Sequence, residues 1–412
     1  MTSGRLRVAT IAAVAFLSAG LVEAQSLSFS FSGSGGGPDN AFTLTGNGTL
    51  AGGGASLTGT GKASTDDCTN VALFSIKMQG ATAADTLTLL YLVQVPNDIG
   101  PTNTKFTSTS DVNVTAGTGI YGGKGGSGSA TIVVQLLSQS DFTYTLTGTV
   151  NLGGPIIPVA SLTPSGIVPV FSNISTVQPG AWISIYGSGL ANGTSQWNGD
   201  YPTSLGGATV TIDGKAAYLW YVSPGQINLQ VPDDSKKGCV PVVINTANGS
   251  ITSSVDLEPF SPSLSLLDSQ YVAGVILTPN GTGAYGGGTY DLMGPTGRFS
   301  FNTRPVRRGE TVELFAVGLG PTKTPVPAGK VYTGPPASTS NPIQVVLKNQ
   351  QGNFFSPVVQ FAGLVASGVY QINATIPQTF PTGQFQIIVS VGPLGNPIAG
   401  TSQDFVVYMN IQ

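Results

Sequence analysis

The sequence predicts an all-β protein, with a glycine-rich N-terminal antiparallel β-domain followed by two tandem immunoglobulin-like β-sandwiches. Two properties of the composition indicate strands joined by many turns. The 412 residues include 57 glycines, and 40% are hydrophobic while only 8% are charged. The apolar residues fall in short alternating runs between clusters of glycine, serine and threonine, which is typical of β-structure. A strand pattern that occurs twice in the C-terminal half predicts the tandem sandwiches.

The first 24 residues have the pattern of a secretory signal peptide. Arg5 and Arg7 precede the apolar stretch 8–19, and small residues occupy the positions before a cleavage site. Twelve apolar residues are too few to cross a bilayer as an anchor. We expect cleavage between Ala24 and Gln25, no transmembrane segment in the mature chain, and a secreted or cell-surface location.

Residues 25–152 form the first predicted domain, a meander of antiparallel strands that is either a sandwich or a small barrel. Glycine clusters separate its short apolar runs, and no convincing helical stretch interrupts them. Its segment GTGIYGGKGGSG is similar to glycine-rich strand–turn motifs of small secreted β-barrels such as the dirigent-like group. Four prolines in residues 153–169 predict a linker, because proline disfavours central strands and stiffens linkers.

Two segments of the C-terminal half occur twice in the same order. ISIYGSGL at 183–190 matches VELFAVGL at 312–319, and QINLQVP at 226–232 matches QINATIP at 371–377. Within each matched strand apolar residues alternate with other side chains, so one face is buried. A shared internal order predicts two copies of one domain.

The spacing of the two matches defines the second copy. The two copies of the first segment are 129 positions apart, and the two copies of the second segment are 145 positions apart. The second copy of the domain therefore contains a sixteen-residue insertion. We expect sandwiches over 170–262 and 263–412, with the insertion near 321–336. Their lengths suit immunoglobulin-like domains with additions.

Four longer segments carry a family resemblance: VQPGAWISIYGSGLA, WNGDYPTSLGGATVTIDGKAAYLWYVSPGQINLQVPDD, YVAGVILTPNGTGAYGGGTYDLMGP and RPVRRGETVELFAVGLGPT. Residues 165–412 resemble the Solibacter-type C-terminal domain, an uncharacterised family of exported acidobacterial proteins. They also resemble the IPT/TIG group of immunoglobulin-like modules. The second copy departs from that pattern where Ala316 replaces the glycine found at Gly187. The resemblance implies an exported β-rich region and provides no catalytic residues.

The residue types exclude several kinds of chemistry. No histidine is present, which excludes Ser-His-Asp and Cys-His catalysis and imidazole zinc ligands. The net charge of −3 does not provide the basic surface that nucleic-acid binding requires. We recognise no catalytic motif and expect no enzyme activity, cofactor or metal site. Cys68 and Cys239 are interpreted as two buried thiols, with one bridge between domains as the alternative.

Aromatic residues concentrate in the first sandwich. Four are candidate ligand contacts, namely Trp197, Tyr201, Trp220 and Tyr221. Exposed rings can stack on the flat faces of sugars. The competing interpretation is that these rings fill the core and the interface between the sandwiches. Trp197, in the loop GTSQWNGDYP, is the best candidate for an exposed ring.

Two charged clusters are interpreted as local ion pairs. The acidic pair Asp233–Asp234 precedes Lys236–Lys237, which predicts a charge-balanced turn. Arginines 298, 304, 307 and 308 lie close in sequence to Glu310 and Glu313.

These observations support three functional hypotheses. The first is an exported non-enzymatic protein for cell-surface or extracellular adhesion or scaffolding. The second is a carbohydrate-binding protein that uses the aromatics of the first sandwich. The third is an enzyme or small-ligand binder seated in the N-terminal domain. The expected partners are an extracellular polysaccharide or a cell-surface protein, and not a nucleic acid.

Overall fold

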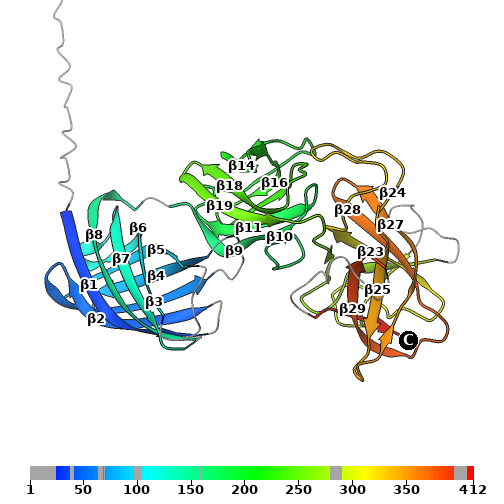
Figure 1. Ribbon diagram of the computed structural model, residues 1–412, viewed down its shortest axis with the longest axis horizontal. Coiled ribbons are helices and arrows are strands. Elements are labelled where there is room, and N and C mark those ends of the chain that lie inside the picture. The colour runs from blue at the N-terminus through cyan, green and yellow to red at the C-terminus, as the bar shows by residue number, and fades with distance from the viewer. Residues whose placement is uncertain are drawn as a thin grey trace, which may run out of the picture.

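Three β-rich modules follow one another along the long axis of the molecule (Figure 1). The computed structural model describes residues 25–37, 41–63, 68, 70–96, 104–138, 140–156, 159–278, 290–393 and 406–412. The all-β class is confirmed, since these residues form strands and a single short 3-10 helix, η1 (Gly119–Tyr121). The signal-peptide prediction for residues 1–24 lies outside the described residues.

The first module is a closed antiparallel barrel, so the barrel alternative is confirmed over the sandwich. Each strand pairs with the next, and the last pairs with the first. Leu27, Phe29 and Phe31 alternate with outward serines on the first strand, and at most 3% of each is exposed. The strands are β1 (Gln25–Gly36), β2 (Phe42–Leu50), β3 (Gly53–Ala63), β4 (Val71–Gln79), β5 (Thr86–Gln94), β6 (Lys105–Thr118), β7 (Lys124–Leu136) and β8 (Asp141–Pro155).

The second module is a sandwich of a five-stranded and a six-stranded sheet. The five-stranded sheet has the order β12-β16-β17-β11-β9, and the other has the order β10-β19-β18-β14-β13 with β15 beside β14. The strands are β9 (Ser161–Pro169), β10 (Thr176–Val177), β11 (Trp182–Ser188), β12 (Ser195–Gln196), β13 (Ser204–Leu205), β14 (Ala208–Ile212), β15 (Lys215–Ala216), β16 (Tyr218–Val222), β17 (Gln226–Gln230), β18 (Gly238–Thr246) and β19 (Gly249–Leu257).

The third module is a sandwich of a seven-stranded and a four-stranded sheet. The first has the order β22-β21-β23-β28-β27-β24 with β20 beside β23, and the second has the order β26-β25-β29-β30. The strands are β20 (Ser263–Leu264), β21 (Gly274–Leu277), β22 (Tyr290–Leu292), β23 (Thr311–Val317), β24 (Ala337–Ser338), β25 (Ile343–Lys348), β26 (Phe354–Phe355), β27 (Val358–Ala366), β28 (Val369–Thr375), β29 (Gly383–Val391) and β30 (Tyr408–Ile411).

The two sandwiches pair their repeated strands in the same register. Ile183 of β11 lies opposite Leu229 of β17, and the equivalent Val312 of β23 lies opposite Ala374 of β28. The next three pairs along each strand keep the same offsets of 129 and 145 positions. Because register decides which side chains enter the core, this correspondence supports two copies of one domain.

The correspondence extends beyond the matched segments. Val177 pairs in parallel with Leu257 at the edge of the first sandwich, and Val306 pairs in parallel with Ile411 in the second. In each sandwich, this pair adds the segment before the repeated strand to the edge of the second sheet. The insertion near 321–336 falls between β23 and β24, where the described chain forms no strand.

Most of the predicted proline-rich linker is a strand. Residues 161–169 form β9 at the edge of the five-stranded sheet and pair with β11. Pro169 ends the strand, and the register shifts between Ile185 and Gly187, opposite the segment that contains Pro164. An edge strand tolerates proline because one row of its backbone groups has no sheet partner. The linker prediction for 153–169 is therefore wrong for its second half.

A disulfide between Cys68 and Cys239 joins the barrel to the first sandwich. Cys68 lies between β3 and β4, and Cys239 lies on β18. The hydroxyl of Ser254 donates a hydrogen bond of 2.9 Å to the carbonyl oxygen of Cys68 at the same junction. The interpretation as two free thiols is wrong, because folding brings together two cysteines separated by 171 positions. The bridge between domains was the alternative.

The insertion of the second sandwich contacts the first sandwich. Backbone N–H groups of Ala328 and Gly329 donate hydrogen bonds to the side chains of Asp233 and Gln230, at 3.0 and 2.9 Å. Gly329 also lies against the ring of Tyr218, where a Cβ atom would be 2.1 Å from the ring. We call residues 321–336 the strap.

A second set of contacts between the sandwiches lies beneath the strap. The side chain of Gln178 accepts a hydrogen bond of 2.6 Å from the N–H of Gly320, and its amide nitrogen lies 3.4 Å from the hydroxyl of Tyr370. The indole N–H of Trp182 donates a hydrogen bond of 2.7 Å to the carbonyl oxygen of Ser367. These buried bonds fix the angle between the two sandwiches.

Candidate functional site

Three of the four candidate aromatic residues gather around Trp182. The ring of Trp182 lies 5.5 Å from that of Trp197, 5.9 Å from Trp220 and 6.1 Å from Tyr201. Trp197 and Tyr201 also meet edge to face at 4.5 Å. Such contacts stabilise aromatic clusters beyond the area that they bury. Tyr221, the fourth candidate, makes no ring contact of this kind among the described residues.

A β-bulge brings Trp220 and Tyr221 to the same side of the sheet. Leu219 lies opposite Leu229, but Tyr221 already lies opposite Asn228, so Trp220 is the extra residue. Leu219 and Leu229 are fully buried, while both aromatic residues are half-buried. A bulge interrupts the strict alternation of a strand and redirects its side chains. Strand β16 therefore presents two neighbouring rings on the outer face.

Amide side chains lie beside these rings on the same face. The oxygen of Asn228 accepts hydrogen bonds from the hydroxyl of Ser184 at 2.9 Å and from the amide of Gln226 at 2.7 Å. Gln226 in turn lies opposite Tyr186 across the β11–β17 pair. Tyr186 is 38% exposed, and Gln226 and Asn228 are half-buried.

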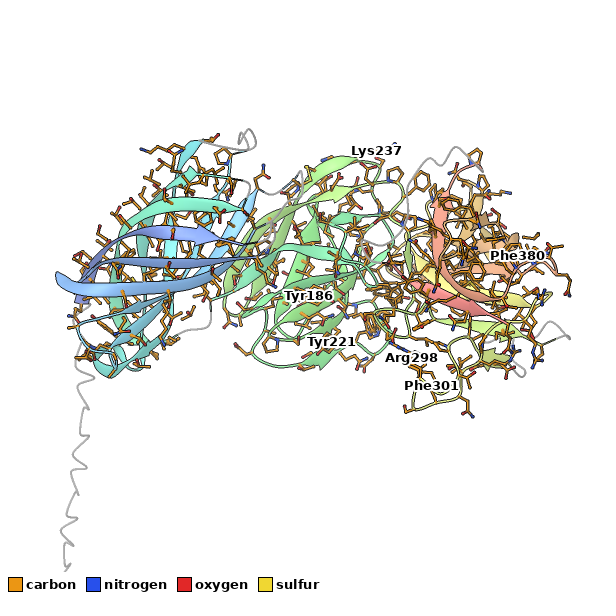
Figure 2. The ribbon with its side chains drawn as sticks, turned by 90° about the horizontal axis from the view of Figure 1, so that it is seen from below. Tyr186, Tyr221, Lys237, Arg298, Phe301 and Phe380 are labelled. Carbon is orange, nitrogen blue, oxygen red and sulfur yellow. A yellow bond between two sulfur atoms is a disulfide. The ribbon has the colours of Figure 1, made fainter. Side chains whose placement is uncertain are left out.

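We call the set Tyr186, Trp197, Trp220, Tyr221, Gln226 and Asn228 the aromatic face. Figure 2 shows Tyr186 and Tyr221 on one side of the first sandwich. Elsewhere the outer side of the sheet is covered, because Trp182 and Gln230 are buried and bond to Ser367 and Gly329 of the second sandwich. The competing interpretation of the aromatics is thus correct for most of the cluster, since Trp197, Tyr201 and Trp220 pack with Trp182 against Val317 and Val369 of the second sandwich. Each of the three keeps part of its surface exposed. Whether the aromatic face contacts a ligand stays a prediction.

The second sandwich repeats the framework of this face with different side chains. Its strand β27 shifts register between Val359 and Phe361, so Gln360 occupies the position of Trp220. The amide of Gln371 donates a hydrogen bond of 2.7 Å to the oxygen of Asn373, as Gln226 does to Asn228. The same amide donates to Glu313, which stands where the first copy has Ser184. The bulge and the amide pair therefore belong to the shared domain, and the tryptophan belongs to the first copy alone.

No charged residue occurs in the five strands of the sheet that carries the aromatic face. Their sequences are SLTPSGIVP, WISIYGS, SQ, YLWYV and QINLQ. The equivalent sheet of the second copy contains Glu313 and Asp291. The strands beneath the rings of the first copy are therefore polar but uncharged, while the loop that carries Trp197 and Tyr201 also carries the exposed Asp200.

The sequence did not identify Tyr186, Gln226 or Asn228 as members of this face. Tyr186 occupies an outward position of a recognised alternating strand, so its alternation was the available signal. The two amides fall within the repeated QIN segment, which the sequence assigned to a strand without a role for its polar residues.

The acidic pair and the lysines after it form ion pairs, but their partners lie in the hairpin at residues 213–215 and not in their own turn. Lys236 lies 2.6 Å from Asp213, and Lys215 lies 3.2 Å from Asp234. A hydrogen bond from the backbone N–H of Lys236, together with Lys215, holds the pKa of Asp234 below its ordinary value. These charges balance one another at the turn after β17.

The arginine cluster pairs with Glu310, one of the two expected partners, and also with Asp268 and Asp291. Arg304 reaches Asp291 at 2.7 Å and Glu310 at 2.8 Å, and Arg298 reaches Asp268 at 2.8 Å. Burial opposes ionisation of Glu310, but hydrogen bonds from Arg304 and from the N–H of Arg307 lower its pKa. The charges of Arg298 and Arg304 are therefore neutralised.

The barrel interior is filled with apolar side chains. Its core residues are at most 4% exposed, and the largest fully buried ones are Tyr91, Phe31, Leu44, Leu57, Ile76, Met78, Leu87, Leu89, Ile132, Leu146 and Leu152. The hydroxyl of Tyr91 lies 3.0 and 3.1 Å from the carbonyl oxygens of Ser108 and Ala130. Burial raises the pKa of Tyr91 and Tyr144 to about 12. This packing leaves the hypothesis of a ligand seated in the barrel without support.

Two clefts lie at the module junctions. The cleft between the barrel and the first sandwich has a volume of about 940 Å³, and the cleft under the strap has about 360 Å³. Asp111 is the one carboxylate among the described residues that line the larger cleft. One carboxylate does not provide the acid and base pair of glycoside hydrolysis. The described residues contain no group of three potential metal ligands, and their only helix is far too short to span a membrane.

Comparisons with known proteins give no family. No protein-family model matches the chain, and no curated protein matches it in sequence. The resemblance to the Solibacter-type family therefore stays a prediction.

Three solved structures match with low similarity. They are the Escherichia coli adhesin FdeC at 10% identity (TM-score 0.20, 85% of this chain and 95% of that one), the plexin A4 extracellular region at 8% (0.15, 92% and 56%) and a Corynebacterium diphtheriae protein described as membrane anchored at 9% (0.17, 94% and 97%). At these values the matches carry no argument about what this chain does.

Proposed function

We propose that the protein is an exported, non-catalytic scaffold that holds β-modules in a fixed arrangement for adhesion at the cell surface or in the extracellular matrix. The single observation that carries this proposal is the set of covalent and hydrogen-bonded contacts that join the modules. A disulfide joins the barrel to the first sandwich, and the strap with Gln178 and Trp182 joins the two sandwiches.

Two further properties support the proposal. A disulfide that joins two modules is typical of proteins that work in oxidising compartments, which agrees with export. The barrel has an apolar, filled interior, and the carboxylates of Asp234 and Glu310 are held in ion pairs. Rigid presentation reduces the conformational entropy that an adhesive contact must overcome.

The proposal is tested by attachment and turnover measured on the same material. Microspheres coated with residues 25–412, prepared under oxidising conditions, are washed over surfaces of polysaccharide or matrix protein, and the soluble phase is assayed for released sugar and acid. The proposal expects attachment without product. Product formation that rises with protein concentration would contradict it, and so would the absence of attachment to every surface.

A further inference from the structure

The open outer face of the first sandwich combines the chemistry needed to hold an uncharged polymer of sugars. Tyr186 and Tyr221 present rings, Trp220 exposes part of a ring that packs against Trp182, and Gln226 and Asn228 place amide groups between them. The apolar C–H face of a sugar packs on an aromatic ring, and its hydroxyl groups pair with amides. We propose that the aromatic face binds a neutral polysaccharide chain. This inference deepens the proposed scaffold function by naming the surface that makes the adhesive contact.

Charge favours a neutral ligand. The five strands of this sheet carry neither acidic nor basic residues, so an anionic polysaccharide meets no cation there. Burying an unpaired charge of a ligand against such a surface is unfavourable.

The spacing of the rings favours a chain over a single sugar. Tyr186 on β11 and Tyr221 on β16 are separated by strand β17 and are offset by two residues along the sheet. With ordinary strand spacing and rise, their Cα atoms lie about 12 Å apart. One sugar ring does not reach both, whereas an extended chain of several sugars lies across both rings and the amides between them.

The face is held in place before a ligand arrives. Trp220 packs at 5.9 Å against Trp182, which the second sandwich fixes through the hydrogen bond to Ser367. Asn228 is fixed by Ser184 and Gln226. Binding therefore orders few side chains, which improves affinity without additional contacts.

The second sandwich supplies an internal comparison. It has the same bulge and the same Gln–Asn pair, but Gln360 replaces the tryptophan and buried Glu313 replaces the serine. Because the second copy keeps this bulge with glutamine at the extra position, we expect Trp220→Gln to keep the backbone of the bulge in the first copy. That variant removes the ring and preserves the local backbone.

The test uses residues 25–412 with the disulfide intact. Retention is measured by depletion on insoluble cellulose, chitin, starch and β-1,3-glucan, and on alginate and heparin beads as anionic polymers. The variants are Trp220→Gln, Tyr221→Ala and Trp220→Phe, which keeps a ring. The matched control is Phe354→Ser, because Phe354 is a 63% exposed ring of the second sandwich away from this face. Thermal unfolding confirms that each variant is folded.

The inference expects retention on at least one neutral polymer. Trp220→Gln and Tyr221→Ala each weaken it about tenfold, as the loss of one stacking contact would. Trp220→Phe retains most of the binding, and Phe354→Ser retains all of it. Retention on none of the neutral polymers, retention on anionic polymers alone, or equal binding by the folded face variants and the wild type would each overturn the inference. None of these outcomes affects the scaffold proposal, which fails on turnover or on the lack of any attachment.

Discussion

Removal of the disulfide is the perturbation with the largest predicted effect on stability. Cys68→Ser together with Cys239→Ser cuts the covalent bridge between the barrel and the first sandwich without leaving a free thiol. The bridge closes a loop of 171 residues that includes β4 to β8 of the barrel and β9 to β17 of the sandwich. The unfolded chain therefore gains conformational freedom when the bridge is lost.

The magnitude follows from the length of the loop. The chain-entropy relation gives about 5 kcal/mol at 25 °C for a loop of this size. If the barrel unfolds while the sandwich stays folded, the loop still contains roughly 90 residues, and the stabilisation from loop closure is nearly the same. Measured losses for native bridges fall between about 2 and 5 kcal/mol, and a barrel of about 130 residues shifts its midpoint by about 4 °C per kcal/mol. We expect a decrease of about 8 to 20 °C.

The assay is calorimetric unfolding of the wild type and the double variant, with and without reductant. We expect reductant to lower the midpoint of the wild type to that of the variant and to leave the variant unchanged. A double variant whose barrel unfolds within about 0.5 kcal/mol of the wild type would refute the reasoning, because the bridge would then constrain nothing in the unfolded chain.

Three further predictions concern the barrel and the sandwich interface. Burial raises the pKa of Tyr91 and Tyr144 to about 12, so their contribution to barrel stability is complete below pH 10 and is lost as the pH rises to 12. Denaturant unfolding between pH 8 and 12 should show this decrease in the free energy of unfolding. Tyr91→Phe should make the decrease with pH less steep. Gly329→Ala should lower the free energy of unfolding by about 1–3 kcal/mol more than Gly352→Ala does, because both positions have φ near +80° but only Gly329 lies against a ring. Equal losses in the two variants would show that the strap does not press on Tyr218. Trp182→Phe removes the N–H donor to Ser367 and should lower the free energy of unfolding by about 1–3 kcal/mol. Amide hydrogen exchange at residues 366–370 should become faster, and unchanged exchange would contradict the prediction.

The duplicated domain was predictable because its signal is local and periodic. Alternation of Ile183 and Ile185 sets which face of β11 is buried, and the same alternation in the second copy sets the face of β23. One register then places the repeated QIN segment opposite each strand. The barrel was predictable only as an alternative to a sandwich, because closure depends on β1 meeting β8, a contact between the two ends of the domain.

The features that escaped prediction depend on contacts between distant segments. Proline suggested a linker at 161–169, but the edge position of β9 makes its prolines acceptable. Cys68 and Cys239 carry no local sign of pairing, since the module junction brings them together. The bulge at Trp220 is likewise a property of the pairing with β17 and not of the sequence YLWYV. The aromatic residues were recognised, yet their division between the interface and an open face required the folded sheet.

The central claim is that the three modules form one rigid body. The most direct measurement is the distance distribution between spin labels at Ile120→Cys in the barrel and Phe354→Cys in the second sandwich, both at exposed positions. The account predicts a single narrow distribution in the protein with its native disulfide. A broad distribution extending over tens of ångströms in the oxidised protein would contradict it.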